Sequence, residues 1–147
     1  MAMLNDFRSS IFKWISEYIS AVKTSGIDPD VEFLNFDWHS ELTEIKVKSA
    51  VGPIGFSVSA MDETFPEVSF GVAITCVDDI NGFRHTSMMD LLFESLLPRS
   101  QIPVVDSSTG EKIGWMQVVT STMPPMERTE TRPIQMVLVR CLTSLTY

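Results

Sequence analysis

The clearest pattern in the chain is an amphipathic helix close to its beginning. Apolar residues recur there at three- and four-residue spacing, as on the buried side of an α-helix. The stripe consists of Phe7, Ile11, Trp14, Ile15, Tyr18, Ile19 and Val22. Asn5 or Asp6 is suited to cap the start of this helix, and Gly26 its end. Phe12 falls outside the stripe, on the otherwise polar side.

Strand patterns follow the helix. Residues 31–38 (VEFLNFDW) predict a strand that changes face near Leu34, which indicates a bulge. Residues 45–48 and 56–60 alternate between apolar and polar side chains, and glycine and proline lie between them at 52–55. This arrangement predicts a hairpin with one polar face.

The middle of the chain predicts a further strand and a second helix. Residues 68–75 alternate between large apolar side chains and small ones, so one face of this strand lets another layer come close. Ser87 and Asp90 fit a capping box that opens a short helix, and Pro98 stops it. This helix is so apolar that we expect it to be buried against the sheet.

The last third of the chain predicts two strands joined by a long connection. The first strand holds Ile113 to Val119 and follows a surface turn at 106–110 (DSSTG). The second covers 132–142 (RPIQMVLVRCL) and is apolar on both of its faces. Its second face therefore needs a cover, and both the hairpin strands of the same chain and a neighbouring molecule are suitable.

The connection at 121–132 (STMPPMERTETR) has two prolines and no apolar period, which predicts a loop that is long for a hairpin. It is interpreted either as a mobile loop or as an arm that docks on a neighbour. In the second interpretation Met123 and Met126 supply adaptable apolar tips beside a rigid Pro124-Pro125 step. The predicted subunit interface comprises Met123, Pro124, Pro125, Met126, Val137 and Val139.

Together these elements predict an α+β fold: a mixed, mainly antiparallel sheet packed by an N-terminal amphipathic helix and a second short helix. The 147 residues, 44% of them hydrophobic, suit a single domain over 1–147 with an extended loop at about 121–132. No segment is apolar enough for a membrane span, and polar residues within MAMLNDFRSS argue against a signal peptide. Cys76 and Cys141 lie in apolar runs, so reduced core thiols are favoured over a disulfide.

The formal charge is −8, and the 11 lysines and arginines are spread singly along the chain. Binding to nucleic acid through phosphate neutralisation is therefore not expected. An acidic surface serves solubility in most proteins. It also suits a wall that repels DNA, or a surface for a basic partner.

Catalytic and metal-binding patterns are almost absent. His39 and His85 have no cysteine or second histidine at ligand spacing, and no phosphate-binding glycine loop or nucleophile elbow occurs. Asp78 with Asp79, and Asp62 with Glu63, are interpreted as turn formers rather than acid–base or cation sites. We therefore expect no enzyme, no metal and no cofactor.

The order of elements resembles the tail terminator and neck (head-tail connector) proteins of long-tailed bacteriophages. The stretches that carry this resemblance are FRSSIFKWISEYI, FPEVSFGVAIT, SMMDLLFESLLP and RPIQMVLVRCL. The resemblance implies a structural virion protein, assembled in the host cytoplasm, that forms a hexameric ring on the tail tube. Its partners would be further copies of the chain, tail tube and neck proteins, and DNA that crosses an acidic lumen without specific binding.

Two alternatives stay open. Small acidic chaperones of type III secretion are similar in size and charge, although they usually close with a third helix, which the TSLTY ending leaves no room for. An enzyme would need a cleft with perturbed carboxylates, for example near Asp78 and Asp79.

Overall fold

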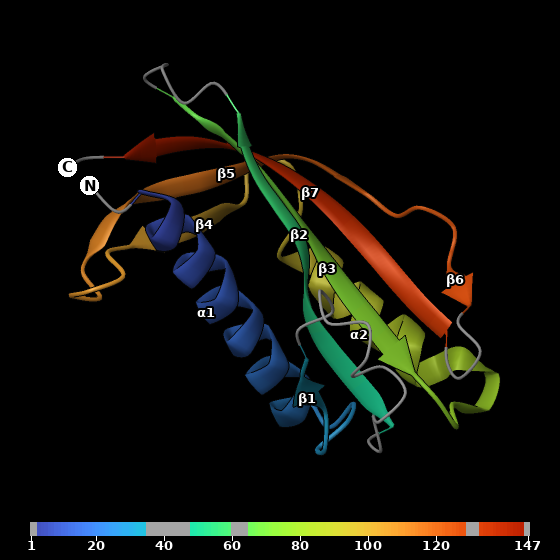
Figure 1. Cartoon of the computed structure of the whole chain (residues 1–147). Helices are drawn as coiled ribbons and strands as arrows, with labels where there is room; N and C mark the ends of the chain where they lie inside the picture. Colours follow the sequence, from blue (N-terminus) through green and yellow to red (C-terminus); the bar gives the residue numbers. More distant parts are fainter. Residues whose placement is uncertain (1–2, 35–47, 60–64, 129–132, 146–147) are drawn as a thin grey trace.

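The computed structural model describes residues 3–34, 48–59, 65–128 and 133–145. Two helices, α1 (Met3–Thr24) and α2 (Phe83–Glu94), pack on one sheet (Figure 1). The strands run in the order β1-β2-β3-β7-β5-β4, and β6 pairs with β7. Their bounds are β1 Glu32–Phe33, β2 Ser49–Ser59, β3 Glu67–Cys76, β4 Gln101–Val105, β5 Lys112–Thr122, β6 Glu127–Arg128 and β7 Pro133–Leu145. β1 and β2 are parallel and the other pairs antiparallel, which confirms the predicted fold class.

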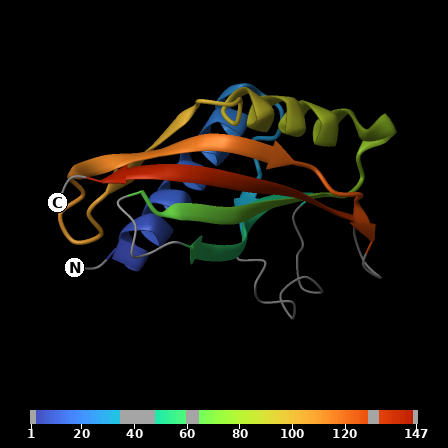
Figure 2. The same ribbon diagram turned by 90° about the horizontal axis from the view of Figure 1, so that it is seen from above.

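Both helices cover the same face of the sheet, here called the core face. α1 crosses this face obliquely, from β4 at its beginning to β1 at its end, and α2 lies beside it (Figures 1 and 2). The predicted stripe of α1 is buried except for the half-buried Trp14, whose ring packs edge-on against Phe70. Helix and strand side chains form one apolar cluster, whose largest fully buried members include Phe7, Ile15, Ile74, Met88, Leu92 and Met116.

Buried polar groups fix the first half of α1 to the end of β4. The Ser10 hydroxyl donates to the Asp6 carbonyl at 2.6 Å and accepts the Val105 N–H at 2.9 Å. The Asp6 carboxylate accepts the Ser107 N–H at 2.8 Å. Because α1 already begins at Met3, the predicted cap at Asn5 or Asp6 is wrong. Gly26, with φ +79°, follows the helix as predicted.

The hairpin predicted around residues 52–55 is wrong. β2 runs straight through Gly52, Pro53 and Gly55 and pairs along its length with β3. Gly55 forms a bulge at φ +77°, where the register shifts between Ile54 and Phe56. Pro53 is tolerated because its missing N–H lies on the side of β2 that faces β1, where the described pairing covers only Ala50 and Val51. The predicted strand at 45–47 lies outside the described residues, as do residues 35–38.

The second helix begins at Phe83, five residues before the first helical position that a capping box at Ser87 predicts. Its start is stabilised by Asp79, whose two carboxylate oxygens accept the backbone N–H groups of Arg84 and His85 at 2.9 and 2.8 Å. Although burial works against its ionisation, these bonds lower the pKa of Asp79. Asn81 and Gly82, at φ +58° and +72°, form the tight turn that leads from Asp79 into the helix.

The second half of the sheet contains two strands that the sequence did not predict, β4 and the two-residue β6. β4 is only five residues long and contains Pro103, so its pattern is weak. The turn at Asp106–Gly110 is confirmed, with the Asp106 carboxylate accepting the N–H groups of Ser108 and Thr109 at 2.8 and 3.1 Å. The predicted strand from Ile113 is confirmed as part of β5.

Candidate protein-contact surface

The two faces of β7 lie in different environments, although both are apolar. Val137, Val139 and Cys141 point to the core face and are at most 2% exposed. The alternate residues point to the opposite side of the sheet, here called the second face. On this face Ile134 is buried, Met136 is half-buried, and Leu138 and Leu142 are 46% and 47% exposed. The second face therefore leaves large apolar side chains in contact with solvent.

The small residues of β3 bring neighbouring backbone close to the second face. Gly71 pairs with Leu138 on one side and with Ile54 on the other. A Cβ atom at position 71 would overlap the Ile54 carbonyl oxygen and lie 2.9 Å from Ile54 Cγ2. Ala73 and Ile134 form a small apolar cluster farther along this face, which Ile54 and Met136 extend. The small residues of β3 thus lie on the second face, and the predicted close approach of another layer to this face stays a prediction.

A shallow hollow of about 390 Å³ opens on the second face. Its apolar side chains on this face are those of Ile54 and Leu138, while Phe56, which pairs with the core-face residue Phe70, borders it. Serines and threonines of β2, β3 and β5 surround these side chains. At one end the Arg140 guanidinium is paired with the Glu67 carboxylate. Such a surface, apolar at its centre and polar at its rim, is typical of a protein-contact site.

The predicted interface residues fall into an exposed group and a buried group. Met123 and Met126 are 54% and 39% exposed, and Pro125 is also exposed, so these residues stay available to a partner. Val137 and Val139 are not available, because they are buried under the helices of their own chain. The exposed apolar residues of β7 are Leu138 and Leu142 instead. The sequence indicates which face of β7 is exposed, because the charged Arg140 lies on the same face as Leu138 and Leu142.

The segment Met123–Met126, here called the proline segment, runs beside β7. Thr122 pairs with Leu138 and Glu127 with Ile134, so the register before and after the proline segment differs by only one residue. The Gln135 amide donates to the Pro124 carbonyl at 2.7 Å. β5 and β6 thus pair with β7 one after the other, and the proline segment separates them. Part of the predicted long loop is regular structure, and residues 129–132 lie outside the described part.

Outside this surface, the cysteine, aspartate and histidine side chains that could take part in catalysis or metal binding contribute to the fold instead. Cys76 and Cys141 are free, buried thiols, and burial raises the pKa of both, that of Cys141 to about 12. Asp79 holds the start of α2, while Asp78 is exposed. His85 lies near both, and burial lowers its pKa against the opposing effect of Asp79. Within the described residues, no group of three or more acidic, histidine or cysteine side chains is arranged to hold a metal ion. His39, Asp62 and Glu63 lie outside them.

Comparison with protein-family models and with curated proteins finds no match for this chain. Among the helices in the part that the structure describes, none is long and apolar enough to cross a membrane. The function therefore has to be inferred from the surface itself.

Proposed function

We propose that this protein is a structural subunit of a homo-oligomeric ring, of the kind that terminates a bacteriophage tail tube and joins it to the head. The observation that carries the proposal is the second face of the sheet, where Leu138 and Leu142 are exposed and Leu138 lines a hollow. In a monomer these apolar side chains stay in contact with water, which is unfavourable. A subunit of a ring buries them against its neighbours.

Features near the two ends of the described sheet support assembly through faces rather than through added strands. β2, next to the terminal strand β1, carries Pro53 and the Gly55 bulge, and the terminal strand β4 carries Pro103. Proline and bulges protect sheet edges from pairing with another chain. The exposed proline segment, with Met123 and Met126, supplies a further adaptable apolar surface.

The charge of the chain suits a ring that DNA crosses. A formal charge of −8 per copy gives the assembled ring a strongly negative field. Because tight phosphate contacts would hold DNA in place, a negative lumen favours its movement. The expected partners are further copies of this chain, the tail tube and the neck proteins.

Light scattering after size exclusion, with negative-stain imaging, tests the proposal on the purified chain at micromolar concentration. We expect a discrete ring, which the resemblance makes hexameric. The variant Leu138→Ser/Leu142→Ser should assemble more weakly or fail to attach to tail tubes, while it stays folded with only a modest loss of thermal stability. Leu97→Ser is the matched control, because Leu97 is 60% exposed but lies after α2, on the helix side. A monomer that neither forms rings nor binds tail tubes contradicts the proposal.

A protein-binding module is the second candidate, and the hollow favours it. Its volume and apolar centre also suit a side chain or short segment of a client protein. A chain that stays monomeric and instead binds secretion substrates one to one, with loss of binding in Leu138→Ser/Leu142→Ser, would support this function over the ring.

A further inference from the structure

The two flanks of α1 carry different surface chemistry. On the flank next to β1, the Phe12 ring packs against Phe33 with 5.7 Å between ring centroids. The guanidinium carbon of Arg8 lies 5.3 Å from the centroid of the Phe12 ring. Arg8 is exposed and Phe33 is 40% exposed. This flank therefore presents a cation held over an aromatic surface, here called the Arg8 knob.

The other flank of α1 forms a groove with α2. The groove, of about 320 Å³, has an apolar floor that includes Trp14 and Leu91. Glu17 of α1 and Glu94 of α2 line it from its two sides, and both are exposed. Two carboxylates above an apolar floor suit a guanidinium together with an apolar or aromatic surface.

The charges on the two helices are complementary. The exposed charged residues of α1 are Arg8, Lys13, Glu17 and Lys23, which give a net charge of +2. Those of α2 are Asp90 and Glu94, which give −2. A basic outer side on α1 is unusual in a chain whose formal charge is −8. A positive surface and a groove of opposite charge thus occur in the same chain.

We propose that the Arg8 knob of one copy docks in the α1–α2 groove of the next copy. This inference rests on the proposed homo-oligomer and names one of its contacts. Arg8 and Glu17 are separated by two and a half turns of helix, so the knob and the groove lie on opposite flanks of α1. A contact between two different surfaces is head-to-tail and generates a ring when its rotation closes.

Charge reversal with mixing tests this contact. Arg8→Glu places a negative knob before a negative groove, and Glu17→Lys/Glu94→Lys places a positive groove before a positive knob. Each variant alone should assemble at least tenfold more weakly than the wild type. An equimolar mixture should recover assembly, because every knob then meets a groove of opposite charge when the two variants alternate. The triple variant Arg8→Glu/Glu17→Lys/Glu94→Lys should recover it without a partner.

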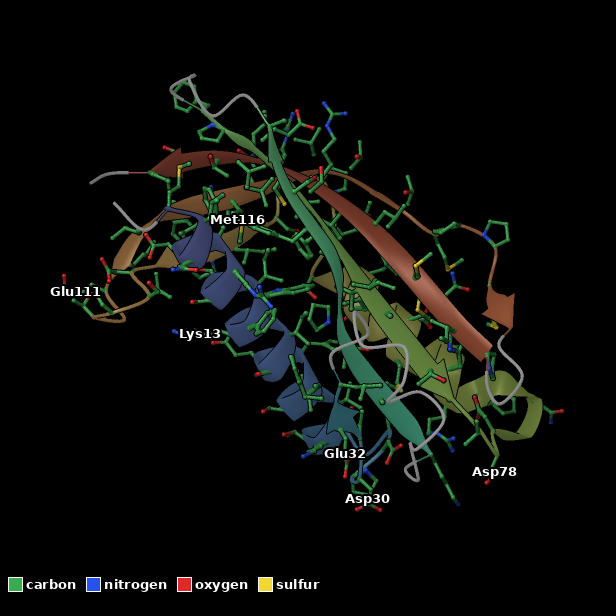
Figure 3. All side chains as sticks on the ribbon, viewed as in Figure 1. Lys13, Asp30, Glu32, Asp78, Glu111 and Met116 are labelled. Atoms are coloured by element: carbon green, nitrogen blue, oxygen red, sulfur yellow. The ribbon has the colours of Figure 1, made fainter. Side chains whose placement is uncertain are left out.

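Lys13→Glu is the matched control for Arg8→Glu. It makes the same change in net charge on the same helix, but Lys13 lies about 140° around the helix from Arg8, and its side chain projects away from the sheet (Figure 3). Assembly of this variant should stay within about threefold of the wild type. Circular dichroism of all variants should match the wild type, since every substituted side chain is exposed.

The outcomes separate this inference from the proposed function. If the wild type forms rings and the reversed variants form them equally well, the knob-and-groove contact is wrong and the ring stands. Failure of the mixture and of the triple variant to recover assembly also overturns the contact. A wild-type chain that stays monomeric and forms no assembly contradicts the ring itself and the contact with it.

Discussion

Gly71 is the residue on which the second face of the sheet depends most directly. The Ile54 backbone approaches it so closely that a Cβ atom would overlap the carbonyl oxygen of Ile54. A backbone neighbour cannot rotate away as a side chain does, so Gly71→Ala has to shift β2 against β3. We expect a loss of about 1–3 kcal/mol in the free energy of unfolding, as for other overpacked sites. Urea denaturation measures it, as a lower midpoint at unchanged slope.

Ser69→Ala is the control for this substitution. It lies on the same strand and face, is half-buried, and already has a Cβ atom. Its free energy of unfolding should stay within about 0.5 kcal/mol of the wild type, the usual range for a partly exposed position. Equal stability of the Gly71→Ala and Ser69→Ala proteins would contradict the close approach of Ile54.

Cys141 makes stability depend on pH in the alkaline range. Burial raises the pKa of its thiol from 9.0 to about 12, so between these values the unfolded chain loses a proton that the folded chain keeps. The contribution of Cys141 is therefore fully present below pH 9 and is lost as the pH rises toward 12. Urea denaturation between pH 9 and 11 should show a shallower decline for Cys141→Ala, by up to about 1.4 kcal/mol per pH unit. Parallel declines in the two proteins would contradict this assignment.

One side chain, that of Asp79, stabilises the start of α2. Both carboxylate oxygens of Asp79 accept backbone N–H groups of the first helical turn, whereas the exposed Asp78 next to it lies outside this arrangement. Asp79→Asn replaces one acceptor by a donor and should cost about 1 kcal/mol in the free energy of unfolding. Asp78→Asn is the matched control and should cost little, because asparagine tolerates the positive φ at this position.

The cost of Asp79→Asn should also depend on pH. The pKa of Asp79 is lowered in the folded chain, so its stabilisation is present above the ordinary value of 3.8 and is lost as the pH falls through the folded value. Thermal or urea unfolding should therefore show the wild type and Asp79→Asn converging at strongly acidic pH. A stability difference that persists unchanged into strong acid would assign the effect of the substitution to something other than the carboxylate.

Elements were predictable where their two faces differ strongly. The stripe of α1 and the large-small alternation of β3 identify helix, strand and core side without any tertiary information. The predictions failed where proline, glycine and aspartate, which usually mark turns and helix starts, had a different structural role. Pro53 lies within the continuous strand β2, and Gly55 marks a bulge rather than a reversal. Asp79 caps α2 across an intervening turn, at a distance that the local capping pattern does not cover.

The candidate surface was predictable only in part. Alternation in β7 shows that both faces are apolar, but the period alone does not say which set of residues the helices cover. That choice depends on where α1 and α2 pack, which is a tertiary property. The position of Arg140 among Leu138 and Leu142 was the available local signal, because a charged side chain favours the solvent side. The α1–α2 groove combines residues far apart in the chain and had no such signal.

At the scale of the whole molecule, net charge makes a prediction about DNA. Non-specific DNA binding requires several cations that neutralise phosphates together, and the chain has 11 basic residues against 19 acidic ones. Some of these cations are also engaged, such as Arg140 with Glu67 and Arg84 with Asp28. Fluorescence anisotropy with a short labelled duplex should therefore detect no binding up to about 100 μM protein at moderate salt.

Asp90→Lys/Glu94→Lys gives this measurement a positive control. The substitutions make the outer sides of both helices basic, so weak, salt-sensitive binding should appear if the acidic surface is what keeps DNA away. Binding by the wild type at low micromolar concentration, weakening steeply with salt, would contradict a lumen through which DNA slides. Such a result would point instead to a local cationic surface, and the basic outer side of α1 would be the first place to substitute.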